Sequence, residues 1–400
     1  MNRFGNPATA VPRRAAACGA HASCRERPAA TMRFAMTGAV TVNAVTFNDP
    51  VTIRSTGTGG SVTVNGAITG ADNASVSISG DTAINLGGAS VYSIAGQTYT
   101  GPVNLTAATT LTSASGNVSF SGSVDGGNTL SVNSGGTASF GGQVGNGTAL
   151  TSLSTAAVSG LVGNYYNTTN FTGPAILRLD SAINFPNFYS AGALPAGISP
   201  DGSFSIEWTG YLVPQYTENY QFNYTNDDNL VVTLNGSTII NSAYSASQSS
   251  TAPIGLVAGV AYPISVRFQE LGGAAYATLN WSSASVGSNA AIPFLTTNTS
   301  STQLNGGSVK TTGAQSYGTN ATLGADTTLT TTSNGSLTFN GSVNASGKTL
   351  TVDANGNGNF TATNSTNNFA TVNVTNANDV SITDTGALSL GTLAIGQDLT

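Results

Sequence analysis

A nine-residue pattern, Gly-x-apolar-x-apolar-x-Gly-x-apolar, recurs along this 400-residue chain and limits what it can fold into. Copies begin at Gly60, Gly116 and Gly335, a variant begins at Gly136, and the step from Gly116 to Gly136 is 20 residues. Alternation with a period of two predicts short β-strands that bury one face. Such strands are too short to form a sheet of their own. Stacked in coils of about 20 residues, each would pair with the copies above and below it and line one continuous core.

A longer internal match supports a repeated coil. Gln97–Tyr99 and Thr109–Thr112 are mirrored by Gln315–Tyr317 and Thr327–Thr330. The alternative is a string of immunoglobulin-like sandwiches, which would need about seven strands in every hundred residues. The shorter period favours a β-solenoid.

Residues 40–158 and 304–400 resemble the Gly-, Thr- and Asn-rich passenger repeats of filamentous-haemagglutinin and autotransporter-type adhesins. The resemblance implies a secreted, right-handed parallel β-helix that serves as a stalk and has no chemistry of its own.

Composition excludes several classes of function. Charged residues make up 7% of the chain, against roughly 25% in an average globular domain. The net charge of −6 argues against nucleic-acid binding, and 39% hydrophobic residues argue against disorder. Residues 34–400 contain no His and no Cys, which excludes Ser–His–Asp, Cys–His, zinc and thiol chemistry there. Hard cations held by oxygen atoms remain possible.

The first 33 residues differ from everything that follows. They hold six of the eleven basic residues, which interrupt the apolar run that a signal peptide needs. Cys18, His21 and Cys24 lack a fourth metal ligand. We expect a disordered head, or a wrongly assigned start with Met32 or Met36 nearer the true frame. We also expect the chain to be a piece of a longer fibrous surface protein or an incomplete gene model, with no transmembrane segment.

The repeat stops between residues 160 and 296. Both tryptophans and ten of the thirteen tyrosines lie in this segment. Its expected strands are longer and more aromatic: Phe204–Trp208, Asn219–Tyr224, Leu230–Leu234, Tyr262–Phe268 and Ala275–Trp281. This pattern predicts an antiparallel sandwich or closed barrel with its own core. The prediction is therefore an all-β chain with a head (1–33), solenoid repeats (34–158), a β-sandwich (159–297) and further solenoid repeats (298–400).

The central segment is similar to the PA-fourteen family, the β-sandwich of anthrax protective antigen, yeast flocculins and many bacterial adhesins and glycosidases. The residues that carry the resemblance are Gly160–Tyr166, Arg178–Asp180, Phe204–Tyr211, Tyr220–Phe222 leading to Asp227-Asp228, Leu234–Gly236, Gly259–Ile264, Glu270, Trp281 and Ile292-Pro293.

The resemblance implies a Ca²⁺ site and a sugar site. In binding members, two adjacent aspartates joined by a cis peptide hold Ca²⁺, which coordinates vicinal hydroxyls of a terminal sugar. Asp227 and Asp228 match this pair. The second calcium loop aligns with Gln269–Ala274, where the carbonyls of Leu271, Gly272 and Gly273 and the side chain of Gln269 are the expected ligands. An Asn in place of Leu271 would match the family better. Glu270 matches the family's glutamate, and a structural role for it stays open.

The chemistry of the aspartate pair also stands without the family. Asp227-Asp228 is the only adjacent acidic pair in the chain. Ca²⁺ takes about six to eight oxygen ligands, and neighbouring carboxylates repel one another unless a cation neutralises them. The alternative is that Asn226–Asn229 is only a hairpin turn. Tyr244 is a candidate for stacking on a sugar, and Trp208 and Trp281 are expected to pack in the core.

We therefore expect a non-enzymatic adhesin, secreted or on the bacterial cell surface, that binds cell-surface or matrix glycans through Ca²⁺. The first alternative is a structural spacer or protein-docking module without sugar binding. The second is an accessory domain of a carbohydrate-active enzyme, which needs a carboxylate pair about 5–9.5 Å apart. The solenoid repeats contain only scattered aspartates: Asp72, Asp81, Asp125, Asp326 and Asp353.

Overall fold

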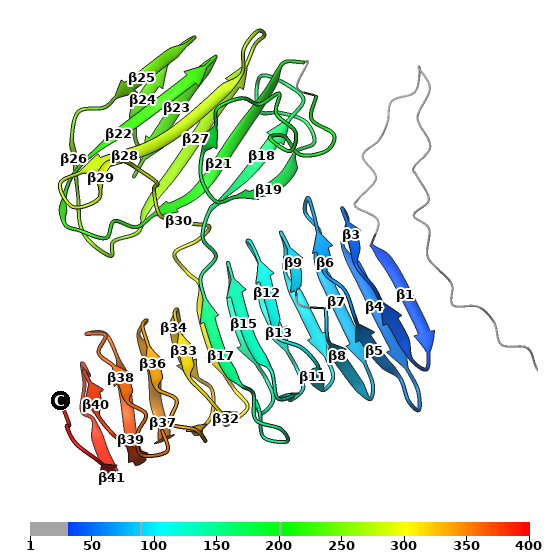
Figure 1. Cartoon of the computed structure of the whole chain (residues 1–400), viewed down its shortest axis with the longest axis vertical. Coiled ribbons are helices and arrows are strands. Elements are labelled where there is room, and N and C mark those ends of the chain that lie inside the picture. The colour runs from blue at the N-terminus through cyan, green and yellow to red at the C-terminus, as the bar shows by residue number, and fades with distance from the viewer. Residues whose placement is uncertain (1–30, 89, 200–201) are drawn as a thin grey trace, which may run out of the picture.

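The computed structural model describes residues 31–88, 90–199 and 202–400 (Figure 1). The predictions for Cys18, His21, Cys24 and most of the head lie outside these residues. The described part is all β, as predicted: it has 41 strands and no helix, so it also holds no helix long and apolar enough to cross a membrane. Two architectures are present, a stack of parallel coils and a group of antiparallel strands beside it.

The stack is a solenoid whose strands lie on three faces. Each face is a parallel sheet, because a strand of one coil pairs with the equivalent strand of the next, as Val51 pairs with Val76. The first face and its branches contain β1 (Met32–Thr37), β4 (Val51–Thr56), β7 (Val76–Gly80), β10 (Gln97–Thr100), β13 (Val118–Phe120), β16 (Thr137–Phe140), β31 (Ser301–Leu304), β32 (Ser308–Thr311), β34 (Asn320–Leu323), β35 (Thr327–Thr331), β37 (Val343–Asp353), β39 (Asn368–Ala377) and β41 (Ser389–Ile395).

The other two solenoid faces follow the same rule. The second contains β2 (Val40–Val42), β5 (Ser61–Val64), β8 (Ala83–Leu86), β11 (Val103–Leu105) and β14 (Val124–Asp125). The third contains β3 (Val45–Phe47), β6 (Ile68–Gly70), β9 (Ser90–Ser93), β12 (Thr109–Ser113), β15 (Thr129–Ser134), β17 (Ser152–Ala156), β33 (Gln315–Tyr317), β36 (Leu337–Phe339), β38 (Phe360–Ala362) and β40 (Val380–Ile382).

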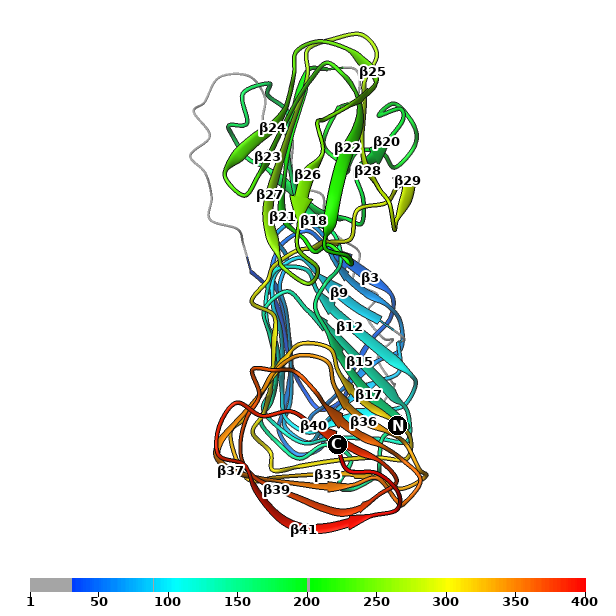
Figure 2. The same cartoon turned by 90° about the vertical axis from the view of Figure 1, so that its left-hand side faces the viewer.

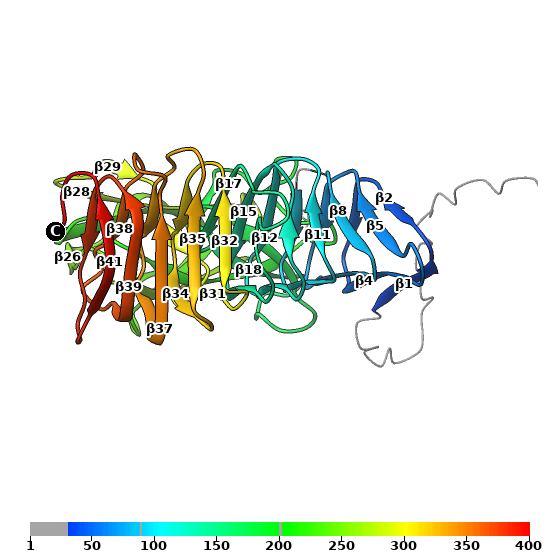
Figure 3. The same cartoon turned by 90° about the horizontal axis from the view of Figure 1, so that it is seen from below.

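The two groups of repeats form one uninterrupted solenoid. β16 pairs in parallel with β31, with Phe140 opposite Leu304, and β17 pairs with β33, with Leu153 opposite Gln315. Figure 3 shows the coils following one another from β1 to β41 along a single axis. One hydrophobic core runs from Phe47 to Val380. The central segment is therefore an insertion between two adjacent coils.

The insertion forms two antiparallel sheets with a separate core. One sheet contains β18 (Leu161–Tyr166), β19 (Ile176–Asp180), β21 (Phe204–Leu212), β23 (Asn229–Leu234), β24 (Ser237–Ser242), β27 (Tyr262–Glu270) and β30 (Phe294–Leu295). The other contains β20 (Asn184–Phe185), β22 (Glu218–Asp227), β25 (Ala246–Ser250), β26 (Ile254–Leu256), β28 (Tyr276–Ser283) and β29 (Gly287–Ala290). Trp208 and Trp281 are buried in this core, which confirms their predicted packing role.

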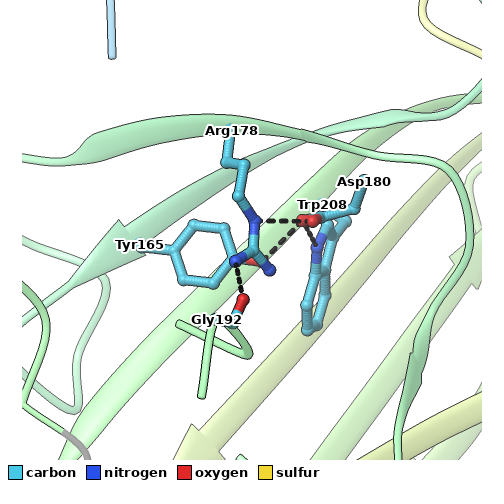
Figure 4. A network of polar contacts seen from close by, with 5 residues as sticks. All are labelled: Tyr165, Arg178, Asp180, Gly192 and Trp208. Atoms are coloured by element: carbon cyan, nitrogen blue, oxygen red, sulfur yellow. Dashed lines mark hydrogen bonds and ion pairs between the residues drawn. The ribbon is translucent and has the colours of Figure 1, made fainter. Parts of the chain in front are cut away.

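A buried polar network fastens one end of the sandwich (Figure 4). The Asp180 carboxylate accepts hydrogen bonds from the Tyr165 hydroxyl (2.5 Å) and the Trp208 indole N–H (2.7 Å), and it pairs with Arg178 at 2.7 Å. Arg178 also donates to the Gly192 carbonyl oxygen. Burial raises the pKa of Asp180, whereas the guanidinium and the three hydrogen bonds oppose that rise. The network joins β18, β19 and β21 and forms the ion pair expected from Arg178 and Asp180.

The sandwich lies beside the solenoid and contacts it (Figure 2). The Leu177 N–H donates to Asp72 Oδ1 at 2.9 Å, and the backbone of Leu179 hydrogen-bonds the Tyr92 hydroxyl. Burial raises the pKa of Tyr92 to about 12. β19 therefore rests on two solenoid coils.

A candidate metal and ligand site where the two sheets exchange strands

The adjacent aspartates lie where the chain crosses between the two sheets. β22 ends at Asp227 and pairs with β28, whereas β23 begins at Asn229 and pairs with β27 in the other sheet. The hairpin-turn interpretation is therefore wrong, since a hairpin would pair β22 with β23. The peptide bond between Asp227 and Asp228 is cis, as the family resemblance implies.

The expected second calcium loop is a neighbouring crossover between the same sheets. It connects the end of β27 at Glu270 to the start of β28 at Tyr276. Tyr276 lies opposite Asp227, and the Leu271 N–H donates to Asp228 Oδ2 at 2.7 Å. The fold thus brings two segments more than forty residues apart into contact.

The glycines of this loop keep its backbone accessible. Gly272 and Gly273 have φ values of 137° and 105°, and a Cβ built on either would meet nothing within 4 Å. The Gly273 carbonyl oxygen accepts a hydrogen bond from the Tyr189 hydroxyl, and the Leu271 carbonyl oxygen accepts one from Ser203 at 3.4 Å. A carbonyl oxygen has two lone pairs, so these groups keep capacity for a further partner.

The Gln269 side chain is engaged elsewhere. Its Nε2 donates to the Thr169 carbonyl oxygen, and its Oε1 accepts from Asn229 Nδ2 at 3.1 Å. As a metal ligand it would have to give up the contact with Asn229, so the loop offers mainly carbonyl oxygens.

Two further oxygen atoms lie buried beside the aspartates. Glu270 Oε1 accepts the Gly272 N–H at 2.9 Å, while Glu270 Oε2 and Asn226 Oδ1 have no hydrogen-bond partner in the described part of the chain. Burial raises the pKa of Glu270 to about 7, and the charges of Asp228 and Asp227 add to the rise. Burial and the neighbouring Asp228 also raise the pKa of Asp227. Sequence reasoning assigned Asn226 only to a turn, because nothing local marks its amide as buried.

The structure brings Tyr244 to the aspartate pair. Its N–H donates to Asn229 Oδ1 and its carbonyl oxygen accepts from Asn226 Nδ2, both at 2.8 Å. The side chain is 74% exposed. The ring is therefore held by its backbone next to the pair while its faces stay open to solvent.

The residues present fit a hard cation. Two adjacent carboxylates, two unpartnered buried oxygens and an open glycine backbone are the oxygen donors that Ca²⁺ prefers. Within residues 31–88, 90–199 and 202–400, no three Asp, Glu, His or Cys side chains form a metal-binding group by themselves. Carbonyl and amide oxygens would thus have to complete the coordination around Asp227 and Asp228.

The scattered aspartates of the solenoid have structural partners. Asp72, Asp81, Asp125, Asp326 and Asp353 accept backbone N–H groups of Leu177, Gly57, Gly147, Thr349 and Asn355, respectively. These bonds of 2.7–3.0 Å fasten turns and, for Asp72, the contact with the sandwich.

Comparison with known proteins identifies the inserted segment. Residues 157–293 match the model of the PA14 domain, which confirms the PA-fourteen resemblance. The chain is 34% identical over 128 residues to the anti-sigma-I factor RsgI3 of Acetivibrio thermocellus. That match covers 32% of this chain and 19% of the relative, so the chain spans about a fifth of that protein's length.

Solved structures are similar over the same share of the chain. An anti-sigma factor domain-containing protein is 33% identical, with a TM-score of 0.30, and the match covers 32% of this chain and 44% of that one. A PA14 sugar-binding domain from an RTX adhesin is 18% identical, with a TM-score of 0.30, over 35% of this chain and 99% of that one. These likenesses concern about a third of the protein.

Proposed function

We propose that this chain is a secreted or cell-surface adhesin of a bacterial exoprotein, in which the solenoid is a stalk and the PA14 domain binds a terminal sugar through Ca²⁺. The observation that carries the proposal is the meeting of the two crossovers. They bring the only adjacent acidic pair of the chain, Asp227 and Asp228, against the open glycine loop Leu271–Gly273.

Each part of the site has a role in this proposal. Bound Ca²⁺ would supply coordination sites for vicinal sugar hydroxyls. Asp227 and Asp228 would neutralise the cation and hold it at the surface, and the absence of side chains at Gly272 and Gly273 leaves room for a sugar ring. The exposed Tyr244 ring offers an apolar face for stacking. A site of this size binds weakly, so many copies on a surface would strengthen attachment by avidity.

Binding is favoured over catalysis by the carboxylates themselves. A glycosidase needs two carboxyl groups that flank the scissile bond. The five solenoid aspartates each accept a backbone hydrogen bond. The carboxylates at the crossovers are adjacent in sequence and suit a cation better than a water or a sugar oxygen between them.

A structural module is the alternative function, and the Gln269 side chain favours it. Because that side chain is bonded to Asn229 and Thr169, the loop supplies fewer ligands than the family pattern implies. In this case the PA14 domain would be a spacer or a protein-docking module.

The test is a calorimetric titration of Ca²⁺ into the full chain, followed by a glycan array with and without chelator. We expect a Kd of about 10⁻⁷–10⁻⁵ M, the range of sensor-type sites. The double variant Asp227→Asn, Asp228→Asn should lose this binding and all chelator-sensitive array signals. The matched control Asp49→Asn, Asp398→Asn removes two exposed solenoid carboxylates and should behave as wild type. Ca²⁺ binding without any glycan signal would indicate the structural module, and no Ca²⁺ binding would overturn the proposal.

A further inference from the structure

A shallow hollow of about 300 Å³ lies on the outer face of the sandwich sheet that contains β23 and β27. It is lined by Asn170, Phe171, Asn229, Val231, Arg267 and Gln269. Along β23, Leu230 and Val232 are buried, so the alternating Asn229 and Val231 face outward. The floor of the hollow is therefore polar sheet surface, and its wall is the loop that follows β18.

Hydrogen bonds hold this wall in place. Ser205 Oγ donates to the Thr168 carbonyl oxygen at 2.6 Å and accepts the Phe171 N–H at 3.1 Å. Gln269 Nε2 donates to the Thr169 carbonyl oxygen. Phe171 adopts a φ of 58°, which a bulky residue rarely does. A wall ordered before binding lowers the entropy cost of taking up a ligand.

Arg267 places a positive charge at the hollow. Its guanidinium carbon lies 3.9 Å from the centre of the Phe171 ring, which keeps the group planar against the wall. Its Nε lies 3.6 Å from Glu207 Oε1, and its side chain is 47% exposed. An exposed pair of this kind contributes little, and the terminal nitrogens make no hydrogen bond to any residue that the structure describes. The other cation of the sandwich, Arg178, is bound to Asp180.

The hollow shares a wall with the aspartate pair. Asn229 directly follows Asp228, so their Cα atoms are about 3.8 Å apart. Asn229 Nδ2 donates to Gln269 Oε1, and the Tyr244 N–H donates to Asn229 Oδ1. A ligand held at Asp228 would extend across Asn229 and Gln269 to reach Arg267.

We propose that this hollow is a second sugar subsite, which takes an anionic sugar residue next to the terminal sugar and binds its carboxylate or sulfate through Arg267. A planar guanidinium binds such groups through two parallel N–H donors, which a neutral sugar cannot match. The order of the two subsites rests on the function proposed above. The preference for a negative charge rests only on the hollow.

The first experiment measures binding to matched disaccharides by calorimetry, using the full chain in Ca²⁺. The probes are lactose, cellobiose and mannobiose, each beside its counterpart oxidised at C6 of the reducing-end sugar to a uronic acid. At least one acid should bind about 5- to 10-fold more tightly than its neutral partner, and the difference should shrink in high salt. Arg267→Gln should remove the preference and keep the neutral binding, whereas Arg54→Gln, at an exposed solenoid arginine, should change neither.

The second experiment separates this subsite from the Ca²⁺ site. Saturation-transfer NMR with free glucuronate should give a signal in wild type and in Asp227→Asn, Asp228→Asn, and none in Arg267→Gln. Loss of every chelator-sensitive signal with the glucuronate signal intact would contradict the proposed function alone. A glucuronate signal that is absent in wild type, or that persists in Arg267→Gln, would overturn the second subsite. So would equal affinity for every neutral and acidic pair.

Discussion

Single residues at the crossovers carry an electrostatic load that the rest of the molecule lacks. Asp227, Asp228 and Glu270 raise one another's proton affinity in a chain where only 7% of residues are charged. Glu270 is almost completely buried, with one carboxylate oxygen bonded to the Gly272 N–H and the other without a partner. Ionising it without a cation nearby is unfavourable, so its charge couples to pH and to any bound cation.

This coupling predicts an unusual pH dependence. The pKa of Glu270 is raised from 4.5 to about 7 in the folded chain. A raised pKa stabilises the fold fully below about 4.5, and the contribution is lost as pH rises through about 7. We expect the melting temperature of the sandwich, measured in chelator, to fall across this interval. Tryptophan fluorescence reports this domain, because both tryptophans lie in its core.

The control is Glu270→Gln, whose melting temperature should change less over the same interval. The comparison is clean because the chain contains one histidine, so few other groups titrate between pH 5 and 8. Adding Ca²⁺ at pH 8 should restore stability in wild type. An equal decline in both proteins would rule out Glu270 as the cause.

At the scale of elements, a buried polar corner appears once in each half of the solenoid. Gln97 Nε2 donates to the carbonyl oxygens of Val91 and Thr112, and the Tyr99 hydroxyl donates to Gln97 Oε1 at 2.9 Å. The equivalent Gln315 donates to the carbonyl oxygens of Val309 and Thr330 and accepts the Tyr317 hydroxyl, also at 2.9 Å. The internal match found in the sequence is thus a repeated hydrogen-bond network that joins adjacent faces of a coil.

Removing one partner should destabilise the coil more than removing both. Gln97→Leu leaves the buried Tyr99 hydroxyl without an acceptor, which costs about 1–3 kcal/mol. The double variant Gln97→Leu, Tyr99→Phe should recover much of this loss, because no unpaired hydroxyl remains. Denaturant midpoints followed by circular dichroism measure both changes. A double variant no more stable than the single one would show that packing, and not the hydroxyl, sets the cost.

At the scale of the whole molecule, the sandwich leaves and rejoins the solenoid at one point. Ser159 forms a bridge with Leu295, and the Thr296 N–H donates to the Val158 carbonyl oxygen at 3.0 Å. The coils on either side pair directly through β16 with β31 and β17 with β33. The solenoid core therefore does not depend on the insertion for its continuity.

Deleting residues 159–296 and joining Val158 to Thr297 should therefore leave a folded solenoid. We expect the β-type circular dichroism to persist and the solenoid's denaturation midpoint to change little, since only surface contacts such as Asp72 with Leu177 are lost. Full-length protein is the reference. An aggregated or unfolded product would mean that the sandwich is needed to hold the two groups of coils in register.

The sequence by itself determined the strand type, the buried faces and the family of the insertion. Those properties depend on local alternation, as in Gly60–Ile68, and on an ordered set of motifs within about 140 residues. It also singled out Asp227-Asp228, because adjacency in the chain is visible without a structure.

Only the tertiary structure decided that the two groups of repeats form one solenoid, since Phe140 and Leu304 pair across an insertion. It also decided that the buried oxygens of Asn226 and Glu270 lie beside the aspartates, and that Phe171 and Arg267 meet at a hollow. These contacts join residues far apart in the chain, and no local period encodes which distant strands become neighbours. Their geometry arises when the sheets close, because closure brings the crossovers and the outer sheet face together.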